Sequence, residues 1–390
     1  MSRFAIRGRM LLSTRLTQGM MLVQDGKIAE IQSGNQSTGT WGPIEMRDAA
    51  YIVPGFIDLQ VNGGFGVEVG EDPEAIRALA AHLPETGVTA FLPTVITSPP
   101  EFYPKVIAAF EAARDAPGAR PLGLHLEGPF LSPERHGAHR RDLIQQADSR
   151  LLDALLESDA VRLMTLAPER SDAPERIRKL REHNVVVSLG HTDATYEQFE
   201  AGAAAGARMA THLYNAMSPF GHRAPGAIGA ALLDDRITVG LIADGVHSHP
   251  ASLRLAFQMK HVSRIALVTD MMAAAGMPPG IYTLGGQAIC VDGTSARLAD
   301  GTLAGSLLTM DQAVRNILEW VRINLADGLR MASETPARLL GLTNVGAIRA
   351  GMDADLVLLD RDVRVQATII RGDVVYEREA QQAKHMPPPK

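Results

Sequence analysis

Four side chains that could bind a metal ion or move a proton stand shortly after short apolar runs of the sequence. They are Glu127, His191, His212 and Asp270. One carboxylate with two imidazoles is a common ligand set for a catalytic zinc ion, with the fourth position left to water. A further carboxylate can accept the proton of that water. The sequence therefore indicates hydrolytic metal chemistry, provided that these residues lie together.

Each of these residues also has an ordinary structural interpretation. A histidine at the end of a strand is more often a hydrogen-bonded packing residue than a ligand, and Glu127 or Asp270 alone could cap a helix or form an ion pair. Their common position favours a site, because packing residues have no reason to gather at one end of a sheet.

The elements that must position them are apolar runs that alternate with amphipathic, helix-like segments. The runs lack polar alternation, as do parallel strands buried on both faces. Eight such units predict an α/β fold, a (β/α)8 TIM barrel, whose functional side chains lie at the C-terminal ends of the strands. A doubly wound open sheet is the alternative, disfavoured because no glycine-rich fingerprint follows the first run. The predicted strands are Tyr51–Leu59, Ala90–Ile96, Pro121–Leu126, Arg162–Leu166, Val185–Leu189, Arg208–Thr211, Ile237–Ile242 and Arg264–Thr269.

Both chain ends contain short β-prone pieces with turn residues. Neither end holds enough strands to fold alone, so we expect a small discontinuous β-sandwich domain of residues 1–50 and 345–380 beside a barrel of residues 51–344. Tyr282–Leu303 predicts β-hairpins inserted after the eighth strand. The polar, proline-ended residues 381–390 predict a disordered tail.

Composition limits the function classes. The 390 residues are 46% hydrophobic and 21% charged, typical of a soluble globular protein. A net charge of −6 argues against nucleic-acid binding through bulk electrostatics, although a few cations could hold one phosphate. Cys290 is the only cysteine, which excludes an internal disulfide and a cysteine-based zinc site. With no signal-peptide pattern and no run near the ~20 apolar residues of a membrane span, we expect a cytoplasmic protein without a membrane partner.

Five sequence blocks carry a family resemblance. They are Pro54–Asp58, Gly123–Phe130, Ser188–Thr192, Thr211–Met217 and Gly305-Ser306. In this order they closely resemble the N-acetylglucosamine-6-phosphate deacetylases of the amidohydrolase superfamily, from about Gly26 to about Val375. The first block alone would indicate only the superfamily.

By this resemblance, Glu127, His191 and His212 match the ligands of a single divalent metal ion. Zn²⁺ suits this ligand set, and Fe²⁺, Co²⁺ or Mn²⁺ could replace it, because availability as well as affinity decides which ion binds. Asp270 matches the catalytic base, which returns the proton to the departing amine. His139 matches the residue that polarises the acetyl carbonyl.

Other positions match substrate contacts. His136 lies close to His139 in the same loop and is the alternative for its role. Arg223 is the natural phosphate partner, because a guanidinium offers bidentate donors; without the neighbouring matches it would be a solvated loop arginine. The matched substrate positions are Ala138, Asn215, Ala216, Arg223, His247, Leu303, Ala304, Gly305 and Ser306.

The sequence departs from the patterns of this superfamily and family at three places. Gln60-Val61-Asn62 stands where many amidohydrolases have His-x-His, and no lysine follows the fourth strand, at Leu166–Glu169. Neutral amides are poor ligands beside imidazole, so a second metal ion is not expected. Ala224 stands where glutamate is expected, which could alter how the loop of Arg223 is held.

The resemblance implies a homodimeric enzyme that hydrolyses N-acetyl-D-glucosamine 6-phosphate to D-glucosamine 6-phosphate and acetate. The nearest alternative is the galactosamine epimer, which differs only at the C4 hydroxyl. An N-acyl amino acid deacylase would have no use for Arg223. A non-catalytic barrel that serves as an interaction module is disfavoured, because all three ligands and the base are present.

Overall fold

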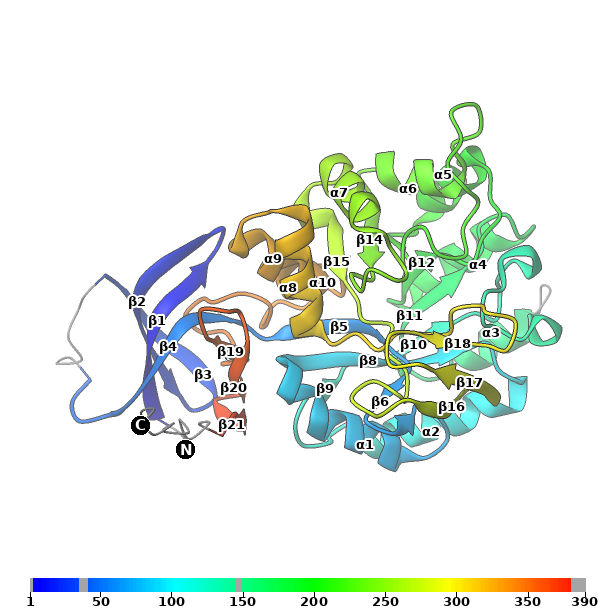
Figure 1. The fold of residues 1–390 in the computed structure, drawn as a ribbon. Helices are drawn as coiled ribbons and strands as arrows, with labels where there is room; N and C mark the ends of the chain where they lie inside the picture. The colour runs from blue at the N-terminus through cyan, green and yellow to red at the C-terminus, as the bar shows by residue number, and fades with distance from the viewer. Residues whose placement is uncertain (1–2, 35–40, 145–148, 380–390) are drawn as a thin grey trace, which may run out of the picture.

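The computed structural model describes residues 3–34, 41–144 and 149–379. Figure 1 shows a twisted sheet built from both ends of the chain beside a larger barrel wrapped by helices. The predicted tail, residues 381–390, lies outside the described residues.

Eight parallel strands form the barrel and confirm the predicted fold class. The first and last strands meet at a seam, where Asp270 N–H donates to Gln60 O at 3.0 Å and Asn62 N–H donates to Met271 O at 2.9 Å. Each predicted strand falls on an observed one. In chain order these are β5 (Phe56–Val61), β8 (Val88–Ile96), β10 (Leu124–Glu127), β11 (Val161–Leu166), β12 (Val186–Leu189), β13 (Met209–Ala210), β14 (Thr238–Leu241) and β15 (Ile265–Leu267), with β9 (Arg120–Pro121) beside β8.

The first predicted strand, Tyr51–Leu59, serves two sheets. Its first part belongs to β4 (Glu45–Pro54), a strand of the sheet built from both chain ends. Its second part is β5 of the barrel. The prediction of one strand was therefore wrong. Pro54 has no N–H with which to continue the pairing, and the chain changes sheets at the next residue.

Helices surround the barrel, and some of them begin at a side-chain cap. At the start of α5, Thr195 Oγ1 accepts the N–H of Gln198, whose side chain accepts the N–H of Thr195 in return. In the part of the chain that is described, no helix is long and apolar enough to span a membrane. The helices are α1 (Pro73–His82), α2 (Tyr103–Ala113), α3 (Ser149–Leu155), α4 (Ala173–Glu182), α5 (Tyr196–Ala205), α6 (Gly226–Leu233), α7 (Pro250–Met259), α8 (Met310–Val321), α9 (Leu325–Ala332) and α10 (Glu334–Leu339).

The chain ends share one mixed sheet of seven strands, in the order β21-β20-β19-β4-β1-β2-β3. The two ends meet where β4 pairs antiparallel with β19, and β1 pairs parallel with β4. Apolar side chains are buried on both faces, in clusters that include Ile6 on one face and Ala5 on the other. The division at residues 50/51 and 344/345 stays a prediction. The remaining strands are β1 (Arg3–Leu12), β2 (Arg15–Gln24), β3 (Lys27–Ser33), β19 (Leu356–Leu359), β20 (Val365–Ile370) and β21 (Asp373–Glu377).

The segment after the eighth barrel strand forms an antiparallel three-stranded sheet, as its turn residues predict. Its strands are β16 (Gly280–Leu284), β17 (Gln287–Val291) and β18 (Ala296–Arg297). Leu284 and Ile289 pack with Ile96 and Met272, which follow or end barrel strands. The insert therefore lies against the C-terminal mouth of the barrel, near the short hairpin of β6 (Gly63–Gly64) and β7 (Val67–Glu68).

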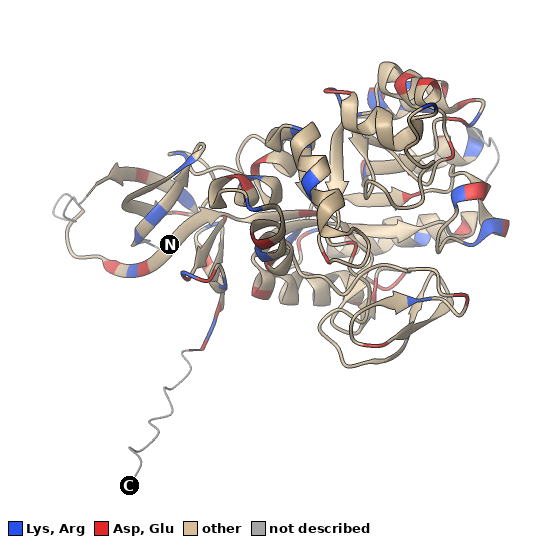
Figure 2. Cartoon of the chain, turned by 45° about the horizontal axis from the view of Figure 1, so that its top comes forward, with Lys and Arg blue, Asp and Glu red and all other residues tan. Residues whose placement is uncertain are grey.

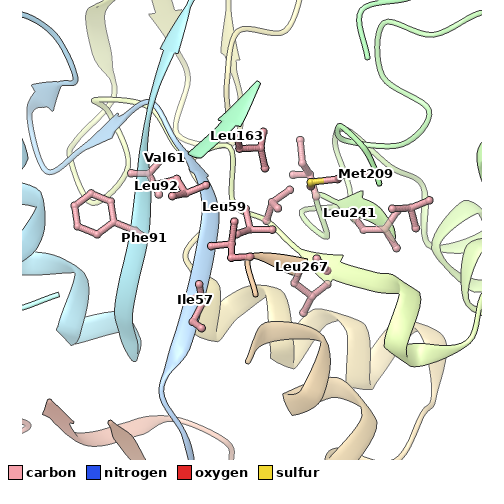
Figure 3. Packing of buried hydrophobic residues seen from close by; sticks show 14 of the residues in the cluster. Ile57, Leu59, Val61, Phe91, Leu92, Leu163, Met209, Leu241 and Leu267 are labelled. Carbon is pink, nitrogen blue, oxygen red and sulfur yellow. The ribbon is translucent and has the colours of Figure 1, made fainter. Parts of the chain in front are cut away.

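One large apolar cluster holds the barrel together, and Figure 3 shows part of it. Leu59, Leu163, Leu241 and Leu267 come from four strands and are at most 1% exposed. Burial of such side chains contributes about 1.5–3 kcal/mol each. This packing fixes the strands whose ends carry the site.

Candidate metal and active site

A cavity of about 470 Å³ opens at the C-terminal ends of the barrel strands. Glu127 is the last residue of β10, and His191 and His212 each follow their strand, β12 or β13, by two residues. Asp270 follows β15 by three residues. All four line the cavity, so the structure brings together the residues that the sequence singled out.

Three ligand atoms converge in this cavity. Glu127 Oε1 lies 2.9 Å from His212 Nε2 and 3.2 Å from His191 Nε2, and the two Nε2 atoms are 3.2 Å apart. Two ligand atoms of a tetrahedral ion with bonds of ~2.0 Å are separated by about 3.3 Å. The triangle thus has nearly the dimensions of one face of such a site.

Hydrogen bonds determine which nitrogen of two imidazoles is free. His191 Nδ1 faces the carbonyl oxygen of Arg135 at 3.0 Å and must donate a proton to it. In neutral His191, Nε2 then keeps its lone pair for a metal ion. His139 has the opposite arrangement: its Nδ1 accepts the backbone N–H of Thr97 at 3.1 Å, so its Nε2 carries the proton.

Glu127, His139 and His191 also come close enough together to hold an ion. His139 Nε2 lies 3.6 Å from Glu127 Oε2, the oxygen that does not face the other two imidazoles. Because a protonated Nε2 is a donor and not a ligand, the geometry favours His212 over His139 as the third ligand. The sequence resemblance points to the same set.

The two amides at the end of the first strand serve the two carboxylates. Gln60 Nε2 donates to Glu127 Oε1 at 3.1 Å, and Asn62 Nδ2 donates to Asp270 Oδ1 at 2.6 Å. Both amide oxygens are buried and have no hydrogen-bond partner among the described residues. The amides therefore use N–H groups to orient carboxylates, and the absence of a second ion stays a prediction.

Burial and charge set the protonation of the site. Burial opposes ionisation of Glu127, but the three imidazoles around it, of His139, His191 and His212, outweigh burial and hold the Glu127 pKa well below its ordinary value. Burial, with the nearby His139, lowers the pKa of His191 to about 4. Burial and the charge of Glu127 raise the pKa of Asp270 to about 6. The ionised Glu127 and the neutral His191 suit a divalent cation. At His212, burial lowers the pKa but Glu127 outweighs it and raises the pKa, so an ion would have to displace a proton there.

The backbone at three site residues is left-handed. His191, His212 and Asp270 have φ of 45°, 26° and 52°. Such values are uncommon for residues other than glycine and cost of order 1–3 kcal/mol each. The surrounding structure maintains them; for Asp270, the N–H donates to Gln60 O and the carbonyl accepts the N–H of Ser306 at 2.7 Å.

Burial and position relative to the cavity distinguish His139 from His136. His139 is 4% exposed and lines the cavity, whereas half-buried His136 is outside the lining and donates from Nδ1 to the backbone oxygen of His139. The geometry therefore supports His139 for the role at the acetyl carbonyl.

The residues matched to substrate contacts fall into two groups. Ala304 and Ser306 are buried outside the lining, and Ser306 Oγ donates to Thr269 O at 2.6 Å, which supports the seam. Arg223 is exposed on the turn between Gly221 and Ala224 and does not line the cavity. The residues that do line it are Ala138, Asn215, Ala216, His247, Leu303 and Gly305.

Sequence reasoning missed several residues of the site. Arg135 and Arg297 line the cavity; Arg135 pairs with Asp193 at 2.7 Å, while Arg297 forms no ion pair with any described residue. Thr97, which orients His139, follows an apolar run but has no charged or metal-binding side chain, so the sequence gave no signal for its role. Arg297 lies on β18 of the inserted sheet and reaches the cavity only because that sheet folds back over the barrel mouth.

A buried polar network that the sequence did not predict lies below the site. His125 donates from Nδ1 to Leu59 O at 3.1 Å and accepts at Nε2 from Thr165, which hydrogen-bonds Thr211 at 2.7 Å. Burial lowers the pKa of His125 to about 4, so it stays neutral. His125 and Thr165 lie on the neighbouring strands β10 and β11, and Thr211 directly follows β13, so the network fixes the strand ends below Glu127 and His212.

Comparison with known proteins identifies the family. Residues 51–375 match the amidohydrolase family. The chain is 38% identical over 377 residues to the N-acetylglucosamine-6-phosphate deacetylase of Bacillus subtilis (strain 168), with 94% of this chain and 95% of the relative covered. The chain belongs to the N-acetylglucosamine-6-phosphate deacetylase family of the amidohydrolase superfamily. The prediction of an amidohydrolase enzyme of the deacetylase type is thereby confirmed.

Two further proteins are similar to the chain in sequence or in fold. The N-acetylgalactosamine-6-phosphate deacetylase of Escherichia coli O157:H7 is 40% identical over 377 residues, 95% of this chain and 98% of that protein. A mutant N-acetyl-D-glucosamine-6-phosphate deacetylase from Mycobacterium smegmatis, in complex with N-acetyl-D-glucosamine-6-phosphate, has a TM-score of 0.91 and 34% identity. That match covers 96% of this chain and 100% of the solved chain.

Proposed function

We propose that the protein hydrolyses N-acetyl-D-glucosamine 6-phosphate to D-glucosamine 6-phosphate and acetate. The observation that carries the proposal is the convergence of Glu127, His191 and His212 in one cavity with Asp270 and His139. The names of the Bacillus subtilis relative and the Mycobacterium smegmatis complex support the gluco substrate.

A single divalent metal ion fits the three ligand atoms, and zinc suits one carboxylate with two imidazoles. When bound by Glu127, His191 and His212, such an ion supplies Lewis-acid polarisation and lowers the pKa of water. Gln60 holds Glu127 through Oε1, and the carbonyl of Arg135 holds the ring of His191. These contacts keep the ligands in place without the ion.

Asp270 moves the protons. Asn62 occupies Oδ1, and Oδ2 has no hydrogen-bond donor among the described residues, so Oδ2 can take the proton of the attacking water. A pKa raised by burial makes the protonated form accessible near neutral pH. Asp270 then gives this proton to the departing sugar nitrogen, because an amine anion is a very poor leaving group.

His139 stabilises the acetyl oxygen. Its Nε2–H faces the cavity because Nδ1 is engaged by the backbone N–H of Thr97. A fixed donor aimed at the oxygen that becomes negative lowers the barrier, since it needs no reorientation during the reaction. The ring is buried, which strengthens this hydrogen bond.

The phosphate partner proposed from the family resemblance is Arg223. Two other arginines, Arg135 and Arg297, line the cavity itself and offer alternative contacts. A homodimer and a cytoplasmic location are further proposals that rest on the resemblance and on the sequence.

The decisive experiment measures free amine released from N-acetylglucosamine 6-phosphate by the metal-loaded enzyme. Parallel reactions contain the galacto epimer, the unphosphorylated sugar and an N-acetyl amino acid. We expect the gluco phosphosugar to give the highest kcat/KM. Faster turnover of the galacto epimer would favour the activity named for the Escherichia coli relative, and no release from either phosphosugar would refute the proposal.

A further inference from the structure

A second cavity, of about 540 Å³, lies at the opposite end of the barrel from the site. Its wall contains the beginnings of neighbouring strands: Arg162 is the second residue of β11, Val185–Val187 enter β12, and Arg208 directly precedes β13. Arg181, near the end of α4, completes a set of three guanidinium groups. No lining residue is acidic.

These three arginines have no carboxylate partner among the described residues. Lys and Arg lie interspersed with Asp and Glu along the ribbon (Figure 2). Arg236, for example, binds Asp234 through two nitrogens, at 2.5 and 2.9 Å. Arg162, Arg181 and Arg208 form no ion pair with any residue in the described ranges.

Two of the guanidinium groups are held in place by backbone oxygens. Arg208 Nη1 donates to Ala207 O at 2.7 Å and to Ala203 O at 3.2 Å. Arg162 Nη2 donates to Leu340 O at 3.1 Å. A guanidinium has five N–H donors, so most donors of each group remain free. Fixed groups with free donors bind an anion at a lower entropic cost.

Glycines make room for two of the arginine side chains. Gly206 has φ of +130°, and a Cβ there would lie 2.0 Å from Arg181 Cδ. Gly123 has φ of +136°, and a Cβ would lie 1.9 Å from Arg162 Cγ. Any other residue at these positions would both strain the backbone and displace an arginine. The backbone is therefore shaped around the arginine stems.

Three positive charges line this cavity, and Asp159, the pKa of which is lowered first by Arg114 and also by Arg162, is paired with Arg114 at 2.7 Å. The pKa of Arg208 is lowered by burial and then by the charges of Arg181 and Arg236. Like charges that face one cavity repel each other, and only solvent screening or an anion relieves the repulsion. Asp234, an acidic group that raises the pKa of Arg208, is already engaged by Arg236.

We propose that this cavity binds a phosphorylated small molecule, whose phosphate oxygens accept N–H donors from Arg162, Arg181 and Arg208. Arginine matches phosphate geometry through paired donors, and the volume is within the range of small-ligand sites. Asn184, also in the lining, offers an amide to the uncharged part of the ligand. The proposal does not depend on the proposed function, because the cavity shares no residue with the active-site cavity.

The test is calorimetric titration of the metal-loaded enzyme with pyrophosphate at constant ionic strength, with chloride as the reference salt. Arg181→Gln and Arg208→Gln should each weaken pyrophosphate binding at least ~10-fold, because each removes charge-assisted hydrogen bonds. Arg254→Gln is the matched control: Arg254 is exposed on α7 and forms no ion pair with a described residue, so affinity should be unchanged. Circular dichroism checks that each variant is folded.

Further titrations with glucose 6-phosphate and adenosine triphosphate show which kind of phosphoester the cavity prefers. Tighter binding of either one to the wild type, lost in Arg181→Gln and Arg208→Gln, supports the site and names the ligand class. Undetectable pyrophosphate binding to the wild type would overturn the proposal. So would affinity that is equal in the wild type and in both variants, since the anion would then bind elsewhere, including the active-site cavity.

Discussion

Asn62 Nδ2 donates a hydrogen bond of 2.6 Å to Oδ1 of Asp270, across the seam where the first and eighth barrel strands meet. Two residues earlier, Gln60 donates to Glu127. The two amides thus support two carboxylates that we assign different tasks, proton transfer for Asp270 and metal binding for Glu127. Variants of the four residues should separate turnover from metal affinity.

Asp270→Asn should keep its metal ion and lose nearly all turnover. Asparagine cannot accept the proton of water, whereas the three ligands are unchanged. Loss of a general base costs ~10²–10⁴-fold in kcat, and more where the same group protonates the leaving amine. Steady-state kinetics together with metal analysis would check this, and wild-type-like turnover would remove Asp270 from its role.

Asn62→Leu and Gln60→Leu should have different effects. The first removes the donor to Asp270, so we expect kcat to fall with metal content unchanged. The second removes the donor to Glu127 and should weaken metal affinity ~10–100-fold, the usual effect of losing a partner of a ligand. Competition with a chelator measures affinity. Equal loss of metal in both variants would contradict the division of tasks.

Arg223→Ala should weaken binding of the phosphorylated substrate far more than binding of the unphosphorylated sugar. The expected loss is about 1.5–3 kcal/mol, the contribution of a hydrogen bond to a charged group. Arg297→Gln is the comparison, because Arg297 lines the cavity without an ion pair among the described residues. The ratio of kcat/KM for the two sugars is the measurement. If Arg297→Gln alone changes that ratio, Arg297 reads the phosphate and Arg223 does not.

The purified active enzyme should hold one tightly bound metal ion per chain. Glu127, His191 and His212 complete one open site, and Gln60 and Asn62 direct N–H groups, not lone pairs, at the carboxylates. Elemental analysis after removal of loose metal gives the number. Two required ions would show that a ligand has been missed, and full activity without any ion would refute the mechanism.

Asp58→Asn should remove a pH dependence of stability. Burial raises the pKa of Asp58 from 3.8 to about 7, although Thr269 donates to it through N–H and OH. Between these values the folded protein keeps a proton that the unfolded chain has lost, so wild-type stability falls as pH rises from about 4 to about 7. The total loss is on the order of 4 kcal/mol.

The asparagine variant has no such proton, and Thr269 Oγ1 can accept its amide N–H. The free energy of unfolding of the variant, relative to that of the wild type, should therefore increase as pH rises from 4 to 8. Urea titrations of both metal-saturated proteins at several pH values test this. Parallel curves for the two proteins would show that Asp58 is ionised in the folded state throughout.

The sequence by itself determined the strand alternation, the barrel, and the residues that we propose as metal ligands and base, because the side-chain pattern of buried parallel strands is local and their C-terminal ends must share one face. Glu127, His191, His212 and Asp270 could be found for that reason. Tertiary structure alone decided the rest. Whether Gln60 and Asn62 offer oxygen or N–H to the site, which nitrogen of His139 is protonated, and where Arg223 and Arg297 lie all depend on contacts between segments far apart in the chain. The same holds for the arginine cavity, where Arg162, Arg181 and Arg208 are unremarkable in sequence and become a set only when neighbouring strands of the closed barrel align their N-terminal ends.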